Sequence, residues 1–209
     1  MKWVSILFFI APWHFTGMNV CNNSAVHFIA NTVTAAQYKN ALTWIEDLKA
    51  FRTAVYSNDK AAVKKYFKFP ILNAGNEIWY LVLTEKEYQE RGISANKGLV
   101  EFKEEDLDKY YKKIFTDAFV KSLLKVQTAE LSKKNASETP AQLEGMYTKY
   151  KMYATYDAET KILSFNLAYF TILKDKKGNT EDKVESNVIY NFSVENDGHI
   201  FFKEIRLAG

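Results

Sequence analysis

Apolar side chains recur every three or four positions between residues 35 and 57, which predicts an amphipathic helix because such positions share one helix face. The apolar face of this helix consists of Ala41, Trp44, Ile45, Leu48, Phe51 and Val55. Asn58 and Asp59 follow as a cap, since their short side chains can accept hydrogen bonds from free amides of the next turn. A second, short helix is therefore expected after them, and Pro70 ends it.

The segment after Pro70 is predicted to form a hairpin and then a third helix. Residues 78–84 begin Ile-Trp-Tyr-Leu-Val-Leu, which is typical of strands, and residues 98–102 form a second short strand. The polar residues between them have room for a helical turn. The third helix begins at Glu104, because carboxylates favour the positive end of a helix dipole. Its apolar face consists of Leu107, Tyr110, Tyr111, Ile114, Phe115, Ala118, Phe119 and Ser122. Polar residues 132–139, before Pro140, predict a loop.

From residue 146 onward apolar and polar positions alternate, which predicts strands because successive strand side chains point to opposite faces. We expect strands over residues 146–156, 162–173, 184–194 and 199–207. Met146, Leu173 and Val184 are placed on the same sides as the other apolar residues of their strands. Glycines that tolerate positive φ stand in the turns, at Gly178 and Gly198. Helices first and then four long antiparallel strands define an α+β domain rather than a parallel sheet.

Composition and charge exclude several classes of protein and of binding site. The chain has 209 residues, 47% hydrophobic and 25% charged, which excludes a disordered, collagen-like or multi-span membrane protein. The net charge of +3 comes without a long basic stripe, so we expect no nucleic-acid partner. Cys21 is the only cysteine, which excludes an intramolecular disulfide and a multi-thiolate zinc site. Neither a metal nor a cofactor is expected.

The amino terminus has the pattern of an export signal. Lys2 is followed by an apolar run that ends at Trp13, too short for a membrane span of about 20 residues. We therefore assign residues 1–25 to a signal peptide and short leader, and residues 26–209 to a single domain that is periplasmic or secreted. No transmembrane span is expected in the mature form. Lipid anchoring through Cys21 is the less favoured alternative, because Val20 is larger than the residue that normally precedes a lipidated cysteine.

Six stretches of the chain carry a family resemblance. They are Phe51-Arg52-Thr53-Ala54-Val55 with Asn58-Asp59-Lys60, residues 63–71, residues 102–106, residues 110–115, and Ile205-Arg206-Leu207-Ala208-Gly209. With the element order, they make residues 38–209 similar to the nuclear-transport-factor-2-like superfamily, in particular to small exported bacterial domains of unknown function. The resemblance implies three N-terminal helices packed on a strongly curved, cone-shaped antiparallel sheet of cystatin-like type. The superfamily includes isomerases, dehydratases, cyclases and non-catalytic modules, so it does not fix the activity.

Aromatic residues make up 15% of the chain, and a cone of this kind would turn many of them inward. The candidates for lining a pocket are Tyr66, Phe69, Trp79, Tyr110, Phe115, Tyr153, Phe165, Tyr169, Tyr190 and Phe202. They indicate a pocket for a small apolar or sugar-like ligand. Ordinary core filling is the other interpretation of the same residues.

Catalytic groups are not evident. The acidic residues of the strand region fall mostly in turns, and His199 follows the turn Asp197-Gly198 with neither an orienting carboxylate nor a pocket evident. We therefore predict a non-catalytic binding module for a small apolar ligand or a protein partner. The alternative is a small isomerase or hydrolase with a carboxylate in the cone pocket. A homodimer through the outer sheet face, which carries Lys149, Lys151 and Thr155, is a further expectation.

Overall fold

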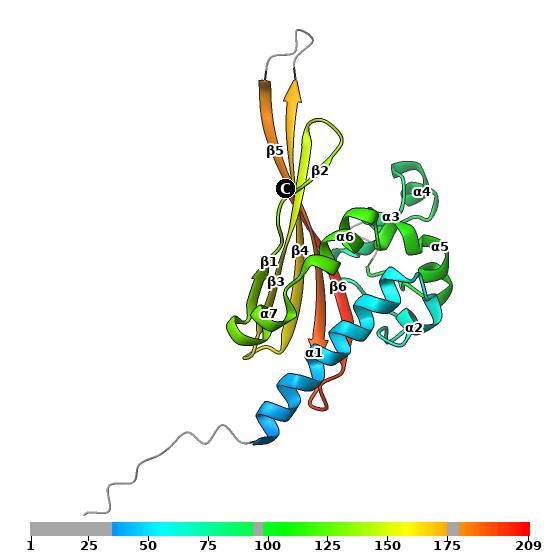
Figure 1. Cartoon of the computed structure of the whole chain (residues 1–209). Helices are drawn as coiled ribbons and strands as arrows, with labels where there is room; N and C mark the ends of the chain where they lie inside the picture. Colours follow the sequence, from blue (N-terminus) through cyan, green and yellow to red (C-terminus); the bar gives the residue numbers. More distant parts are fainter. Residues whose placement is uncertain (1–34, 94–97, 175–179) are drawn as a thin grey trace, which may run out of the picture. The chain divides into compact units, whose positions relative to one another are not determined.

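The computed structural model describes residues 35–93, 98–174 and 180–209, all within one unit, Val33–Gly209. In the described residues seven α-helices precede six strands, so the α+β class is confirmed (Figure 1). The helices are α1 (Ala35–Tyr56), α2 (Lys60–Lys64), α3 (Glu77–Val82), α4 (Glu85–Glu90), α5 (Glu104–Ile114), α6 (Asp117–Lys125) and α7 (Thr128–Lys134). The strands are β1 (Ala136–Glu138), β2 (Gln142–Glu144), β3 (Thr148–Asp157), β4 (Ile162–Lys174), β5 (Thr180–Val194) and β6 (Ile200–Ala208).

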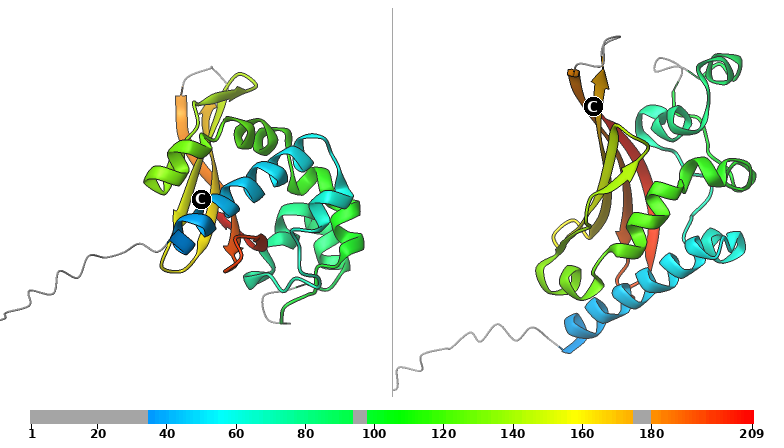
Figure 2. Two further views of the ribbon diagram at one scale, coloured as in Figure 1. Left: turned by 60° about the horizontal axis from the view of Figure 1, so that its bottom comes forward. Right: turned by 45° about the horizontal axis from the view of Figure 1, so that its top comes forward.

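The strands form one open antiparallel sheet in the order β1-β3-β4-β5-β6, and β2 also pairs with β3. The four long strands lie close to the predicted ranges, since strict alternation fixes both the strand and its buried side. The described helices cover one face of the sheet, here called the inner face, and none of them lies on the opposite, outer face (Figure 2). The predicted signal peptide and leader, Cys21 and Gly178 lie outside the described residues.

The core lies between the inner face and the helices. In α1 the predicted apolar side chains from Trp44 to Val55 are buried, whereas the side chain of Ala41 lies outside the described set. Trp44 contacts Tyr156 of β3 with ring centroids 4.7 Å apart, and Phe51 contacts Phe192 of β5 at 5.1 Å. Helix α1 thus lies across the inner face at the end where β5 and β6 meet.

The free edge of β6 is protected by a segment that precedes α3. Phe202 donates its backbone N–H to the Tyr66 carbonyl at 2.7 Å. The buried Asn73 side chain accepts from the Ile205 N–H at 2.6 Å and donates to the Ile205 carbonyl at 3.0 Å, as a neighbouring strand would. Glu77 accepts from the N–H of Leu207. An unpaired strand edge invites aggregation, and this segment occupies it.

Two predicted strands are absent from the described residues. Residues 78–84 form helix α3 instead, because Ile78, Trp79 and Val82 share a helix face that is buried in the core. Tertiary contacts here override the strand preference of the same residues. Residues 98–102 form no strand either, and only Phe102 makes an isolated bridge, to Ile71.

The third helix, predicted as one element from Glu104, is divided into two helices, α5 and α6. Phe115 leaves helical geometry, and the Thr116 hydroxyl then caps α6 by accepting from the Phe119 N–H at 3.2 Å. The predicted apolar face is confirmed across both, from Leu107 to Ser122. The predicted loop 132–139 is wrong, since it holds the end of α7 and strand β1. Buried Thr139 accepts there from the Met152 N–H at 2.9 Å, and this bond fixes the chain beside β3.

Candidate functional site

Six of the ten aromatic pocket candidates belong to the packed interior. At most 4% of the surface of each is exposed, and they are Trp79, Tyr110, Phe115, Phe165, Tyr190 and Phe202. Phe202 stacks on Phe67 with ring centroids 4.7 Å apart, and Phe115 meets Phe119 at 5.6 Å. The Tyr190 hydroxyl donates to the Ile114 carbonyl at 2.7 Å. Their surfaces are therefore occupied by one another and by neighbouring core residues.

The other four candidates are half-buried and lie apart from one another. Tyr66 contacts Phe51 of α1, and Phe69 stacks on Phe67 at 5.6 Å. Tyr169 is on the inner face beside Tyr150, at 6.0 Å. Tyr153 is on the outer face, where the Lys151 ammonium lies 4.5 Å from its ring centre. The sheet separates Tyr153 from Tyr169, so these side chains do not converge on one pocket.

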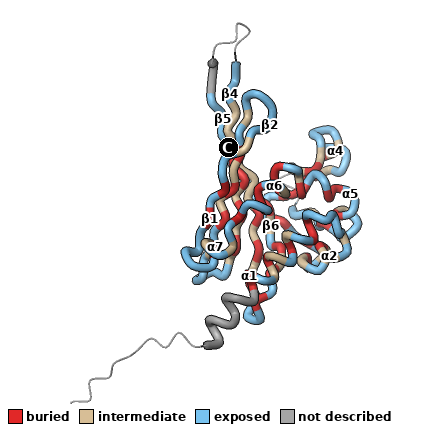
Figure 3. The backbone as a smooth tube through the Cα atoms, viewed as in Figure 1, coloured by how far each residue is buried: buried red, intermediate tan, exposed pale blue. Residues whose placement is uncertain are grey.

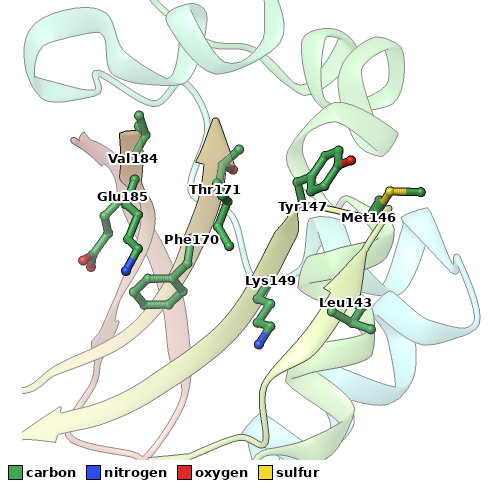
Figure 4. A pocket seen from close by; sticks show the side chains of 10 residues that line it. Leu143, Met146, Tyr147, Lys149, Phe170, Thr171, Val184 and Glu185 are labelled. Atoms are coloured by element: carbon green, nitrogen blue, oxygen red, sulfur yellow. The ribbon is translucent and has the colours of Figure 1, made fainter. Parts of the chain in front are cut away.

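A hollow of about 390 Å³ lies on the outer face, at the end of the sheet where β2 joins β3 (Figure 4). It is lined by Leu143, Met146, Tyr147, Lys149, Phe170, Thr171, Ile172, Lys183, Val184 and Glu185. The strand register explains the arrangement, because residues directly opposite in an antiparallel pair point to the same face. Register partners on β2, β3, β4 and β5 form one row across the sheet. This row consists of Leu143, Lys149, Phe170 and Glu185.

Apolar side chains around this hollow are unusually exposed. Met146 is 80% exposed, Leu143 69% and Tyr147 46%, and Ile172 is also open to solvent. The strands continue here beyond the helix layer, and Figure 3 shows that buried positions give way to exposed ones toward this end. Leu173 and Val184 continue the apolar phase of β4 and β5 on the inner face, and their exposure shows that none of the described helices covers this end of the sheet. Clustered exposed apolar residues of this kind mark interaction surfaces.

Charges of opposite sign flank the apolar centre of the hollow. Lys149 on β3 and Glu185 on β5 stand one strand to either side of half-buried Phe170 on β4, in the same row. With a strand spacing of roughly 5 Å, about 10 Å separates their backbone positions. Among the described residues neither side chain has a hydrogen bond or ion pair. Both charges are thus available to a molecule that covers the hollow.

A second arrangement joins residues that are far apart in sequence. Asp47 of α1 accepts from the Ile200 N–H at 2.8 Å, and its carboxylate lies 3.5 Å from Nδ1 of His199. The Tyr66 hydroxyl is 3.5 Å from Asp47, and burial, followed by this negative charge, raises the pKa of Tyr66 to about 12. The imidazole of His199 does therefore have a carboxylate beside it, which comes from α1 and not from the preceding turn. Since the imidazole is 57% exposed, the main effect of the cluster is to tie α1 to β6.

Comparison with known proteins adds no relative: no family model, curated protein or solved structure matches the chain. The resemblance to the nuclear-transport-factor-2-like superfamily stays a prediction. In the described part of the chain, no three His, Cys, Asp or Glu side chains are grouped so that they could hold a metal ion. Of the helices described, none has the length and apolar character needed to cross a bilayer.

Proposed function

We propose that the protein is an exported, non-catalytic binding module whose binding surface is the hollow on the outer sheet face. The observation that carries this proposal is the group of exposed apolar side chains around the hollow, from Leu143 on β2 to Ile172 on β4. Removing apolar surface from water gains about 25 cal/mol per Å². A small apolar molecule, or apolar side chains of a protein partner, would therefore bind here with a hydrophobic driving force.

The chemistry of the rim restricts what binds. Lys149 and Lys183 stand at the hollow with Glu185, so a ligand with an apolar body and a polar or charged end fits better than a hydrocarbon. The apolar part would contact Phe170 and Ile172, whose side chains lie in neighbouring rows of β4. Charged groups at the rim set orientation and selectivity more than they set affinity.

Anilinonaphthalene sulfonate, an apolar fluorophore with one sulfonate, is a suitable probe. We expect saturable fluorescence enhancement with dilute protein, and a loss of at least tenfold in affinity in Ile172→Glu, which places a charge among the apolar walls. Leu72→Glu is the matched control, since Leu72 is 56% exposed but does not line the hollow. Circular dichroism checks that both variants fold. Equal binding by all three proteins, or no binding by the wild type, would overturn the proposal.

Export and the finer fold type are part of the same proposal. Export to the periplasm or medium is supported by the apolar run between Lys2 and Trp13. A cone-shaped, cystatin-like fold is supported by the order of helices before strands and by helices on one sheet face only. Mass spectrometry of the mature protein tests export, because a first residue beyond Gly17 with Cys21 unmodified is expected.

The alternative, a small hydrolase or isomerase, has one observation in its favour. Asp47, His199 and Tyr66 bring a carboxylate, an imidazole and a phenol together. A carboxylate that orients an imidazole is the usual support for a general base. Hydrolysis of p-nitrophenyl acetate that is lost in His199→Ala would support this alternative. Equal rates for the wild type, the variant and free imidazole would exclude it for this ester.

A further inference from the structure

We infer that the hollow takes a short apolar peptide with both ends free, whose carboxylate meets Lys149 and whose amino group meets Glu185. This inference rests on the proposed function, because it names the ligand class of the same hollow. The hollow measures about 390 Å³, within the range of about 300–1,000 Å³ that is typical of small-molecule sites. A site of this size favours a small ligand over a macromolecular partner.

Opposite charges stand on the two sides of an apolar floor. The register puts Lys149 of β3 and Glu185 of β5 on either side of Phe170 of β4, and Figure 4 shows these side chains on the same side of the sheet. Within the described residues neither charged group has a hydrogen bond or an ion pair. By contrast, the Lys151 ammonium on the same face of β3 lies 2.6 Å from the Glu138 carboxylate. The row thus holds one ammonium and one carboxylate that a ligand with the opposite charges can satisfy together.

The distance between the two charged residues sets the length of the ligand. Two strand spacings, about 10 Å, separate the backbones of Lys149 and Glu185. An extended chain covers about 3.3–3.6 Å per residue, so three residues bridge this distance. A single amino acid carries its amino group and its carboxylate on one carbon, and would reach both residues only if their side chains folded over Phe170. The spacing therefore favours a tripeptide.

The apolar part of the hollow fits the side chains of such a peptide. The central residue of the peptide would lie over half-buried Phe170, and Ile172 stands two residues further along β4 on the same face. Tyr147 borders Ile172, because the Ile172 N–H donates to the Tyr147 carbonyl. Apolar contact supplies the affinity, and the two charges set the direction, with the carboxylate toward β3 and the amino group toward β5.

The same two charges disfavour other occupants. A ligand that covers the hollow takes water from both charged groups, and a charge that loses water without gaining a partner weakens binding. A fatty acid satisfies Lys149 only, and an internal segment of a protein chain lacks both terminal charges. A peptide that is free at both ends satisfies Lys149 and Glu185 at once.

Peptides with blocked ends test the two contacts separately. Isothermal titration calorimetry of the wild-type protein with trileucine should show saturable binding at one site. Acetylation of the amino group and amidation of the carboxylate should each weaken binding about two- to fivefold, as expected for a largely exposed charge pair. Acetylation should make no difference in Glu185→Gln, and amidation should make none in Lys149→Gln, because each variant already lacks that contact. Lys65→Gln and Glu159→Gln, exposed and away from the hollow, should keep both losses.

The outcomes separate this inference from the function on which it rests. Fluorophore binding without trileucine binding refutes the peptide and leaves the binding module intact, whereas binding of neither overturns both. A doubly blocked trileucine that binds as tightly as the free peptide overturns the inference and indicates an internal protein segment. A loss on acetylation that persists in Glu185→Gln refutes the assigned direction. Decanoate that binds as tightly as trileucine, equally in the wild type and in Glu185→Gln, would assign the hollow to an apolar anion instead.

Discussion

Replacing Asn73 with alanine should be among the most destabilising single changes in the chain. The side chain is fully buried and makes three hydrogen bonds. Its Nδ2 donates to the carbonyls of Ala74 at 2.8 Å and Ile205 at 3.0 Å, and its Oδ1 accepts from the Ile205 N–H at 2.6 Å. Alanine leaves both backbone groups of Ile205 without partners at a buried edge of β6.

The size of the effect follows from these orphaned groups. A buried backbone group that loses its hydrogen bond costs about 1–3 kcal/mol, so the two groups of Ile205 together should lower the free energy of unfolding by about 3 kcal/mol. For a domain of this size each kcal/mol shifts the melting temperature by about 2–4 °C, which gives a drop of about 6–12 °C. Asn73→Asp should be at least as damaging, because it removes the donor and adds a buried charge.

Urea titration and differential scanning calorimetry measure the change. Gln89→Ala is the control, since Gln89 is an exposed amide on α4 whose single hydrogen bond goes to Glu85. Its free energy of unfolding should stay within about 0.5 kcal/mol of the wild-type value. A loss below about 1 kcal/mol in Asn73→Ala would show that water or a shifted chain segment satisfies Ile205. The account of how this segment protects β6 would then be wrong.

Three further changes test other parts of the structure. Burial raises the pKa of Tyr190, so its phenol ionises more easily in the unfolded chain than in the folded one. The wild-type protein should therefore lose stability as the pH rises above about 10, and Tyr190→Phe should lose less over the same range in urea titrations. Thr116→Ala removes the cap of α6 and should lower the free energy of unfolding by about 1 kcal/mol, whereas an unchanged value would mean that the hydroxyl bond to Phe119 contributes nothing. Asp47→Ala orphans the buried Ile200 N–H and should lower the melting temperature without changing fluorophore affinity, because the hollow lies at the other end of the sheet. A parallel loss of affinity would show that the two ends are coupled.

The sequence predicts the sheet better than it predicts the middle of the helical layer. Alternation over residues 146–207 places four strands and their buried sides, because a slip of one residue would expose every apolar side chain. The pattern of residues 78–84 does not distinguish a strand from a helix, because Ile78, Trp79 and Val82 could be buried in either one. Contacts of Trp79 with Val100 and Phe102 decide the outcome, and they come from a distant segment.

Exposure of apolar residues at the far end of the inner face depends on where the helices stop, which periodicity does not encode. Val184 continues the apolar phase of β5 and would be core if a helix covered it. Its exposure follows from the extension of the strands past the helices, as does that of Leu173. Lys149 was assigned to the outer face from alternation alone. Alternation does not reveal that Lys149 and Glu185 flank the same residue, Phe170, because that depends on the register of β3, β4 and β5.

Methyl NMR on the methionines is the sharpest test of binding at the hollow. Met146 is 80% exposed at the hollow and Met152 is fully buried in the core, so the two ε-methyl groups report on the binding surface and on the fold separately. The Met146 resonance should shift when the fluorophore is added to dilute protein, while the Met152 resonance stays unchanged. A Met146 resonance that does not respond to the fluorophore would contradict a binding surface at the hollow.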